Sequence, residues 1–208
     1  MKQLERIQVN LQMYKALLLV VTAVLALLVA SPALQRLLVY PQTEFFTEMW
    51  LLGPEHMAEN YPFNITSGKN YNVFLGVGNQ LGKCAYYMVE VKFRNESMSA
   101  PSSFNRTPSS LPSLFSITVF VADKAVGEQF LTFSFDYGFN DPLSKVDFYS
   151  MSLNDVKLDL HGLSSERNST TNRFYGNLIF ELWIYNESTS LFEYHERFVD
   201  LKFNMTAT

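Results

Sequence analysis

The chain has 208 residues, a formal net charge of -4 and a single cysteine, Cys84. The acidic balance excludes the broad basic surface that a nucleic-acid partner requires, and a lone cysteine excludes an intramolecular disulfide. Phe, Trp and Tyr make up 15% of the residues, a share typical of pleated sheets.

An uncharged apolar stretch runs from Ala16 to Leu34, between Lys15 and Arg36. As a helix it spans roughly 28 Å, close to the thickness of a bilayer's hydrocarbon core. A continuous helix satisfies its own backbone hydrogen bonds in lipid. We therefore predict one transmembrane helix over residues 16–36, in a single-pass protein of the cell membrane.

A cleaved secretory signal is the alternative interpretation of this stretch. Ser31, Pro32 and Ala33 place small residues where a cut would fall. Fifteen residues precede the apolar run, however, and residues 37–39 continue it past Arg36. A retained anchor is the favoured prediction.

The cationic residues predict the orientation of the helix. Lys2, Arg6 and Lys15 precede it, and after Arg36 no Lys or Arg occurs before Lys69. Lys and Arg are retained on the cytoplasmic side. Residues 1–15 are thus expected to form a cytoplasmic tail, and residues 37–208 to lie outside the cytoplasm.

Glycosylation acceptor triplets, N-x-[ST], are frequent beyond the helix. Six occur where roughly two are expected by chance, which favours a glycosylated extracytoplasmic surface. The candidate asparagines are Asn64, Asn95, Asn105, Asn168, Asn186 and Asn204.

The remaining chain alternates apolar and polar residues with a period of two, the mark of half-buried strands. The pattern predicts seven to nine strands, no helix, and an immunoglobulin-like antiparallel β-sandwich over residues 56–208 with a lead-in at 37–55. The clearest segments are 71–77, 87–93, 131–137, 178–184 and 199–203. Residues 97–113 are expected to be an exposed Ser/Pro-rich loop, and 164–172 a mobile polar stretch.

Two further expectations concern packing. The segment from Phe46 to Ser67 contains too many large apolar side chains for a solvated linker, so we expect it to supply an edge strand and a fixed turn. Cys84 stands at a strand start beside aromatic residues and is expected to be buried apolar filler.

The stretches F-T-E-M-W-L-L-G-P (46–54) and A-E-N-Y-P-F-N-I-T-S-G (58–68) resemble a family signature. They are similar to F-T-E-F-x-x-L-G-P-x-G-x-A-x-x-Y-P-x-N-[LI]-T-x-G of the archaeal membrane family called domain of unknown function 1616. The resemblance implies an outward immunoglobulin-like module without an assigned activity. It also implies structural roles for Trp50, Gly53, Pro54, Tyr61, Pro62, Asn64 and Gly68. His56 departs from the pattern, because the family has Gly there, and family members commonly have several membrane helices.

No catalytic or cofactor motif is found in the sequence. His56, His161 and His195 lack metal-ligand spacing, and Asp136, Asn140 and Asp141 lack the ligand series of a calcium loop. We expect no cofactor and no metal. The expected function is that of a non-enzymatic cell-envelope module with protein or glycan partners. An accessory subunit that binds through its helix, or an enzyme whose site only the fold assembles, are the alternatives.

Overall fold

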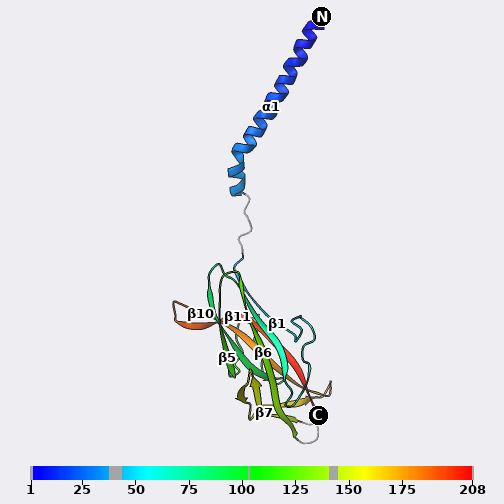
Figure 1. Cartoon of the computed structure of the whole chain (residues 1–208), viewed down its shortest axis with the longest axis vertical. Coiled ribbons are helices and arrows are strands. Elements are labelled where there is room, and N and C mark those ends of the chain that lie inside the picture. Colours follow the sequence, from blue (N-terminus) through cyan, green and yellow to red (C-terminus); the bar gives the residue numbers. More distant parts are fainter. Residues whose placement is uncertain (1, 38–43, 103, 141–144, 208) are drawn as a thin grey trace. The chain divides into compact units, whose positions relative to one another are not determined.

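The computed structural model describes residues 2–37, 44–102, 104–140 and 145–207. They form two compact units, Met1–Glu44 and Phe45–Thr208 (Figure 1). The first contains α1 (Lys2–Leu37), so the helix continues through most of the predicted tail. Within α1, Tyr14–Ser31 has a mean hydropathy of 2.2 and no buried part, and it is long and apolar enough to cross a membrane.

The described part of the second unit contains eleven strands and is mainly β. The excess over the expected seven to nine comes from short strands whose sequences show no regular alternation. The strands are β1 (Phe46–Leu52), β2 (Asn64–Thr66), β3 (Tyr71–Gln80), β4 (Ala85–Asn95), β5 (Phe115–Val121), β6 (Ala125–Asn140), β7 (Lys145–Leu153), β8 (Val156–Asp159), β9 (Ser164–Asn168), β10 (Arg173–Asn186) and β11 (Leu191–Thr206).

These strands form one curled sheet with two halves. The first half contains β1, β3, β6, β7 and β8, and the second contains β5, β4, β10, β11 and β2. All pairs are antiparallel except β11 with β2. Short β9 joins the halves, because it pairs with β7 through Glu166 and with β10 through Asn168. The prediction of a mobile stretch at 164–172 is therefore wrong for its first part.

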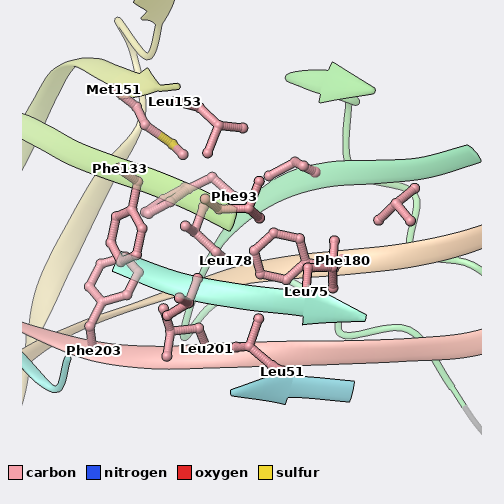
Figure 2. Packing of buried hydrophobic residues seen from close by; sticks show 14 of the residues in the cluster. Leu51, Leu75, Phe93, Phe133, Met151, Leu153, Leu178, Phe180, Leu201 and Phe203 are labelled. Carbon is pink, nitrogen blue, oxygen red and sulfur yellow. The ribbon is translucent and has the colours of Figure 1, made fainter. Parts of the chain in front are cut away.

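The inner faces of the two halves meet in one aromatic-rich core (Figure 2). The ring centroid of Phe93 on β4 lies 4.6 Å from that of Phe148 on β7. Phe135 on β6 and Phe203 on β11 are 4.9 Å apart. Burying one such side chain stabilises the fold by about 1.5–3 kcal/mol. Contacts of this kind hold the halves face to face.

Strand β1 belongs to the fold. It pairs with β3 along its whole length, from Phe46 opposite Gln80 to Leu52 opposite Phe74. The lead-in predicted at residues 37–55 therefore overlaps the compact unit, which begins at Phe45. The edge strand expected within Phe46–Ser67 is present, because its apolar side chains pack on the core.

Cys84 corrects one expectation. Its side chain is exposed, at the end of a turn between β3 and β4. The next residue, Ala85, begins β4 and takes the inward position. The neighbouring aromatic residues suggested burial, but the cysteine precedes the strand and does not share its alternation.

Candidate functional site

The turn after β1 is built around Gly53. Its N–H donates to the carbonyl of Met57 at 2.7 Å, and its own carbonyl accepts from the N–H of His56 at 3.0 Å. A Cβ at position 53 would lie 2.0 Å from the carbonyl oxygen of Glu59. Only glycine fits this close approach of two backbone segments. Pro54, exposed, follows within the same turn.

The structure shows how histidine is accommodated at position 56, where the sequence departs from the family pattern. It adopts φ 61°, in the left-handed region that glycine enters most readily. Its ring packs edge-on against Phe74, with centroids 4.6 Å apart, and its Nε2 lies 2.7 Å from Glu128 Oε1. These contacts hold the histidine where the family has glycine.

The other signature residues also serve the architecture. The Trp50 ring covers Gly76, where a Cβ would lie 2.2 Å from it. The Tyr61 hydroxyl donates to the carbonyl of Leu51 at 2.7 Å, and Pro62, half-buried, follows it. The segment is thereby fixed to the sheet.

Asn64 and Gly68 connect this segment to the opposite strands. The Asn204 amide donates to Asn64 Oδ1 at 3.0 Å. Gly68 takes φ 75° and its N–H donates to the carbonyl of Phe135 at 2.8 Å. Contacts to other parts of the chain are thus made at Trp50, Gly53, Tyr61, Asn64 and Gly68.

The acceptor asparagines lie in different environments. The Oδ1 atoms of Asn95, Asn168 and Asn186 accept the backbone N–H two residues on, at 3.0, 3.0 and 2.9 Å. This is the Asx turn, a feature of surface chain reversals. Asn64 and Asn105 are exposed, whereas Asn204 is only 6% exposed.

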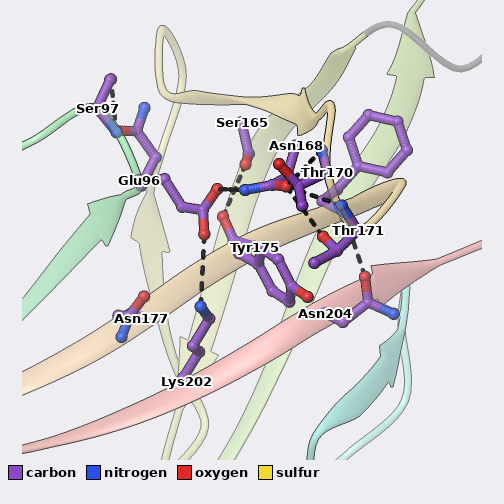
Figure 3. Close-up of polar contacts among 12 residues, drawn as sticks. Glu96, Ser97, Ser165, Asn168, Thr170, Thr171, Tyr175, Asn177, Lys202 and Asn204 are labelled. Carbon is purple, nitrogen blue, oxygen red and sulfur yellow. Dashed lines mark hydrogen bonds and ion pairs between the residues drawn. The ribbon is translucent and has the colours of Figure 1, made fainter.

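Two of these asparagines border one polar hollow of about 390 Å³ at the ends of β4 and β9. Figure 3 shows Glu96 between Asn168 and Lys202. The Asn168 amide donates to Glu96 Oε2 at 2.8 Å, and Lys202 Nζ donates to Oε1 at 3.4 Å. Lys202 also lies 4.0 Å from the centre of the Tyr175 ring. Both carboxylate oxygens of Glu96 thus have hydrogen-bond partners within the protein.

A second hollow, of about 530 Å³, lies on the outer face of β6, β7 and β8, and we call it the bulge hollow. Its lining is Asp136, Tyr149, Ser150, Lys157, Leu158, Asp159 and His161. A β-bulge creates it: Asp136 pairs with Ser150 but Tyr137 pairs with Phe148, so Tyr149 is the extra residue. Bulges redirect side chains in this way.

Acidic, basic and neutral polar side chains line the bulge hollow. Asp136, Ser150 and Asp159 stand opposite one another across three strands. The backbone N–H and the ring of His161 both contact the Asp159 carboxylate and lower the pKa of this group. The Tyr149 hydroxyl lies over Gly138, where a Cβ would come within 2.5 Å of it. Exposed Lys157 supplies a cation.

A buried ion pair lies on the outer face of the second half. Lys92 Nζ is 2.8 Å from Glu181 Oε2 and 3.1 Å from Glu90 Oε2. The loop 97–113 covers the pair, and the N–H of Ser109 donates to Glu181 Oε1 at 2.8 Å. The loop tip is exposed as predicted, but Pro101 and Ser109 are buried against the sheet.

A polar chain connects β1 with β11 inside the protein. His195 Nε2 lies 2.7 Å from Thr47 Oγ1, and the Thr47 carbonyl accepts from Arg197 Nε at 2.9 Å. Thr47 Oγ1 is 3.1 Å from the Tyr87 hydroxyl, which donates to Asn79 Oδ1. A register shift in β11 opposite Leu182–Trp183 accompanies this arrangement.

His195 predicts a pH dependence of folding. Burial, and then the charge of Arg197, lower its pKa below the ordinary value of about 6.5. Below about pH 6.5 the unfolded chain therefore binds more protons at this histidine than the folded chain does. The contribution of His195 to the free energy of unfolding is fully present above this pH and is lost as the pH falls below it. Melting temperatures between pH 7.5 and 5 should fall less steeply in His195→Gln than in the wild type. Equal slopes would contradict the assignment.

The three histidines do not come together. His56 contacts Glu128, His161 contacts Asp159, and His195 contacts Thr47. Within the residues that the structure describes, no three His, Cys, Asp or Glu side chains form a group that could hold a metal ion. Of the weak calcium candidates, Asp141 lies outside the described residues.

The comparison with protein families bears on the signature segment. Residues 41–138 match the model of the family described as Domain of unknown function (DUF1616). This stretch of the chain is similar to that family. The match extends from just before β1 into β6 as far as Gly138, and so includes all seven signature positions and Asp136 of the bulge hollow. The residues of the hollow beyond position 138 lie outside it.

Other comparisons give only distant likenesses, and no curated protein matches the chain. A β-glucosidase from Listeria innocua in complex with glucose shares 7% identity at a TM-score of 0.34, over 80% of this chain and 17% of that one. The PapD-like domain 7 of human CEP192 shares 9% at 0.27, over 82% and 91%. A family 123 glycoside hydrolase from Clostridium perfringens shares 7% at 0.31, over 78% and 27%. These scores are too low to support a function.

Proposed function

We propose that this protein is a membrane-anchored, extracytoplasmic binding module of the cell envelope, with an immunoglobulin-like arrangement of its curled sheet. The observation on which the proposal rests is α1: eighteen consecutive residues of high hydropathy with no buried part, ahead of a unit that has its own core. Apolar surface of this extent is stable in a bilayer.

The anchor is tested with the full chain in its native host. An N-terminal tag should remain on the mature protein, and the protein should float with the membrane fraction through a density gradient in alkaline carbonate. Loss of the tag together with a soluble domain would mean that α1 is a cleaved signal. Release by carbonate alone would mean a peripheral protein.

We assign the ligand site to the bulge hollow. Its volume falls in the range of small-molecule sites, about 300–1,000 Å³. Exposed Tyr149 offers an apolar ring face, the Asp136 and Asp159 carboxylates accept hydrogen bonds, and Lys157 donates them. A ligand rich in hydroxyl groups, such as a cell-envelope glycan, matches this mixture of an aromatic face with donors and acceptors.

If the bulge hollow is the ligand site, Tyr149→Ala should weaken the binding of oligosaccharides. The full-length protein in detergent would be titrated calorimetrically with a panel of oligosaccharides, and the binding member should lose about tenfold or more in affinity. Val156→Ala is the matched control, since Val156 is equally exposed and lies on neighbouring β8 outside the lining. No binding by any panel member, or equal binding by both variants, would refute the assignment. Turnover of the oligosaccharide would favour the enzyme alternative.

Burial predicts which acceptor sites carry glycans in the native host. Asn186, at the end of β10 beside the hairpin tip, should be occupied, because an exposed tip leaves room for a sugar. Asn204 should be bare, because the residue is buried in the fold and leaves no room for a sugar. Glycopeptide mass spectrometry measures both, and a glycan on Asn204 of folded protein would contradict the prediction.

A further inference from the structure

A row of aromatic side chains crosses the outer face of the second half, one from each of four adjacent strands. We call Phe120, Tyr86, Tyr185 and Phe192, on β5, β4, β10 and β11, the aromatic row. Tyr86 pairs with Phe120 and Tyr185 pairs with Phe192. The Tyr86 ring centroid lies 6.3 Å from that of Tyr185 and 5.4 Å from that of Phe192.

The aromatic row is open to solvent. Phe120 is 66% exposed, and Tyr86 and Tyr185 are each more than a third exposed. Phe192 is half-buried. The inward residues of the same strands, such as Tyr87 and Val121, already fill the core, so the fold itself does not require aromatic residues on the outer face. A contiguous exposed apolar surface of this kind indicates a binding surface.

The aromatic row lies at the end of the domain where the chain enters it from α1. Strand β4 begins there and β5 ends there, next to the end of β3, since the Asn79 amide donates to the carbonyl of Val121. The end of β3 pairs with Phe46, the first residue of β1. Exposed Phe45, which packs against Gly82, precedes it. We call this region the tether end.

Chain length limits how far the tether end can be from the end of the helix. Eight residues separate Leu37 from Phe46, and a fully extended chain of that length spans about 30 Å. The exposed aromatic side chains are therefore in the part of the domain that is tied closest to an anchored α1. Tethering of this kind gives an effective concentration of about millimolar, so a weak intrinsic affinity is enough for binding.

We propose that the tether end docks on the outer surface of the bilayer, with the aromatic row in the headgroup region. This rests on the proposed function, because it requires a retained anchor. Tyr and Trp rings favour the membrane interface, where an apolar body and a polar tip are both satisfied. Lys83 and Lys124 near the row are balanced by Asp123, Glu187 and Glu193, so the aromatic surface, and not a basic patch, supplies the attraction.

The native cysteine gives a direct test. Cys84 is exposed at the tether end, and a nitroxide attached to it in the full chain reports depth through the ratio of its collisions with oxygen and with a water-soluble nickel complex. The protein would be reconstituted into phosphatidylcholine liposomes. The matched control is Ala207→Cys in a Cys84→Ser background, since Ala207 is exposed just after β11 at the opposite end. We expect an interfacial label at Cys84 and an aqueous one at position 207.

Removing the row should move the Cys84 label into water. Tyr86→Ser with Phe120→Ser is the test pair, and Phe130→Ser, an equally exposed aromatic on β6, should leave the label interfacial. Aqueous labels at both ends of a protein that floats with liposomes would overturn the docking but leave the anchor intact. A protein that does not float would refute the anchor as well. Spin–spin broadening that vanishes on dilution with unlabelled protein would overturn lipid docking in favour of a second copy.

Discussion

Replacing Lys92 by methionine is expected to lower the free energy of unfolding by about 3–5 kcal/mol, because Glu181 would remain as an uncompensated buried charge. Glu181 has no exposed side-chain surface, and Lys92 supplies its counter-charge at 2.8 Å. The N–H of Ser109 is its other partner. A carboxylate in this position cannot recover the hydration that it lost on folding.

A double-mutant cycle separates the ion pair from simple packing. Glu181→Leu alone should cost less, because Lys92 keeps Glu90 as a counter-charge at 3.1 Å. The double variant Lys92→Met, Glu181→Leu should lose clearly less than the sum of the two single variants. Chemical denaturation of the full chain in detergent measures all four free energies. Additive losses would show that the two side chains do not stabilise each other.

Gly53→Ala is expected to cost at least about 3 kcal/mol, the upper end of overpacking effects. The new Cβ would lie 2.0 Å from the backbone oxygen of Glu59, an atom that cannot move without opening the turn. The hydrogen bond from the Gly53 N–H to Met57 would be lost with it. The edge strand β1 should then separate from the residues that follow.

Gly68→Ala is the control for this substitution. Gly68 also needs a special backbone, with φ 75°, but a Cβ there would meet nothing within 4 Å. It should cost only the left-handed penalty of about 1–2 kcal/mol. Thermal melting of both variants gives the comparison. If the two lose the same stability, the close approach at Gly53 is not what the signature preserves.

The sequence predicted the long strands well because their apolar and polar residues alternate regularly over five to seven residues. Strands β3, β4, β6, β10 and β11 all lie where period two is clear. Strand β9, S-S-E-R-N, could not be predicted in this way, because its strand conformation comes from pairing with β7 and β10. The same pairing turns the expected two sheets into one curled sheet.

The candidate site was harder to predict than the signature. Trp50, Gly53 and Tyr61 could be assigned from contiguous residues. The bulge hollow depends on which residues of β6, β7 and β8 lie opposite one another and on the extra residue Tyr149, which no local pattern gives. The buried ion pair did leave a signal: Glu181 interrupts the apolar run L-I-F-E-L-W-I-Y.

The side of the membrane on which the domain lies tests the account most directly. Reporter cysteines at Ala207 and at Gln3, each in a Cys84→Ser background, would be exposed to a membrane-impermeant maleimide in intact cells and again after lysis. An outward domain on a retained anchor predicts labelling of position 207 before lysis and of position 3 only after it. Labelling in the reverse order, or a mature protein that has lost position 3, would contradict the account.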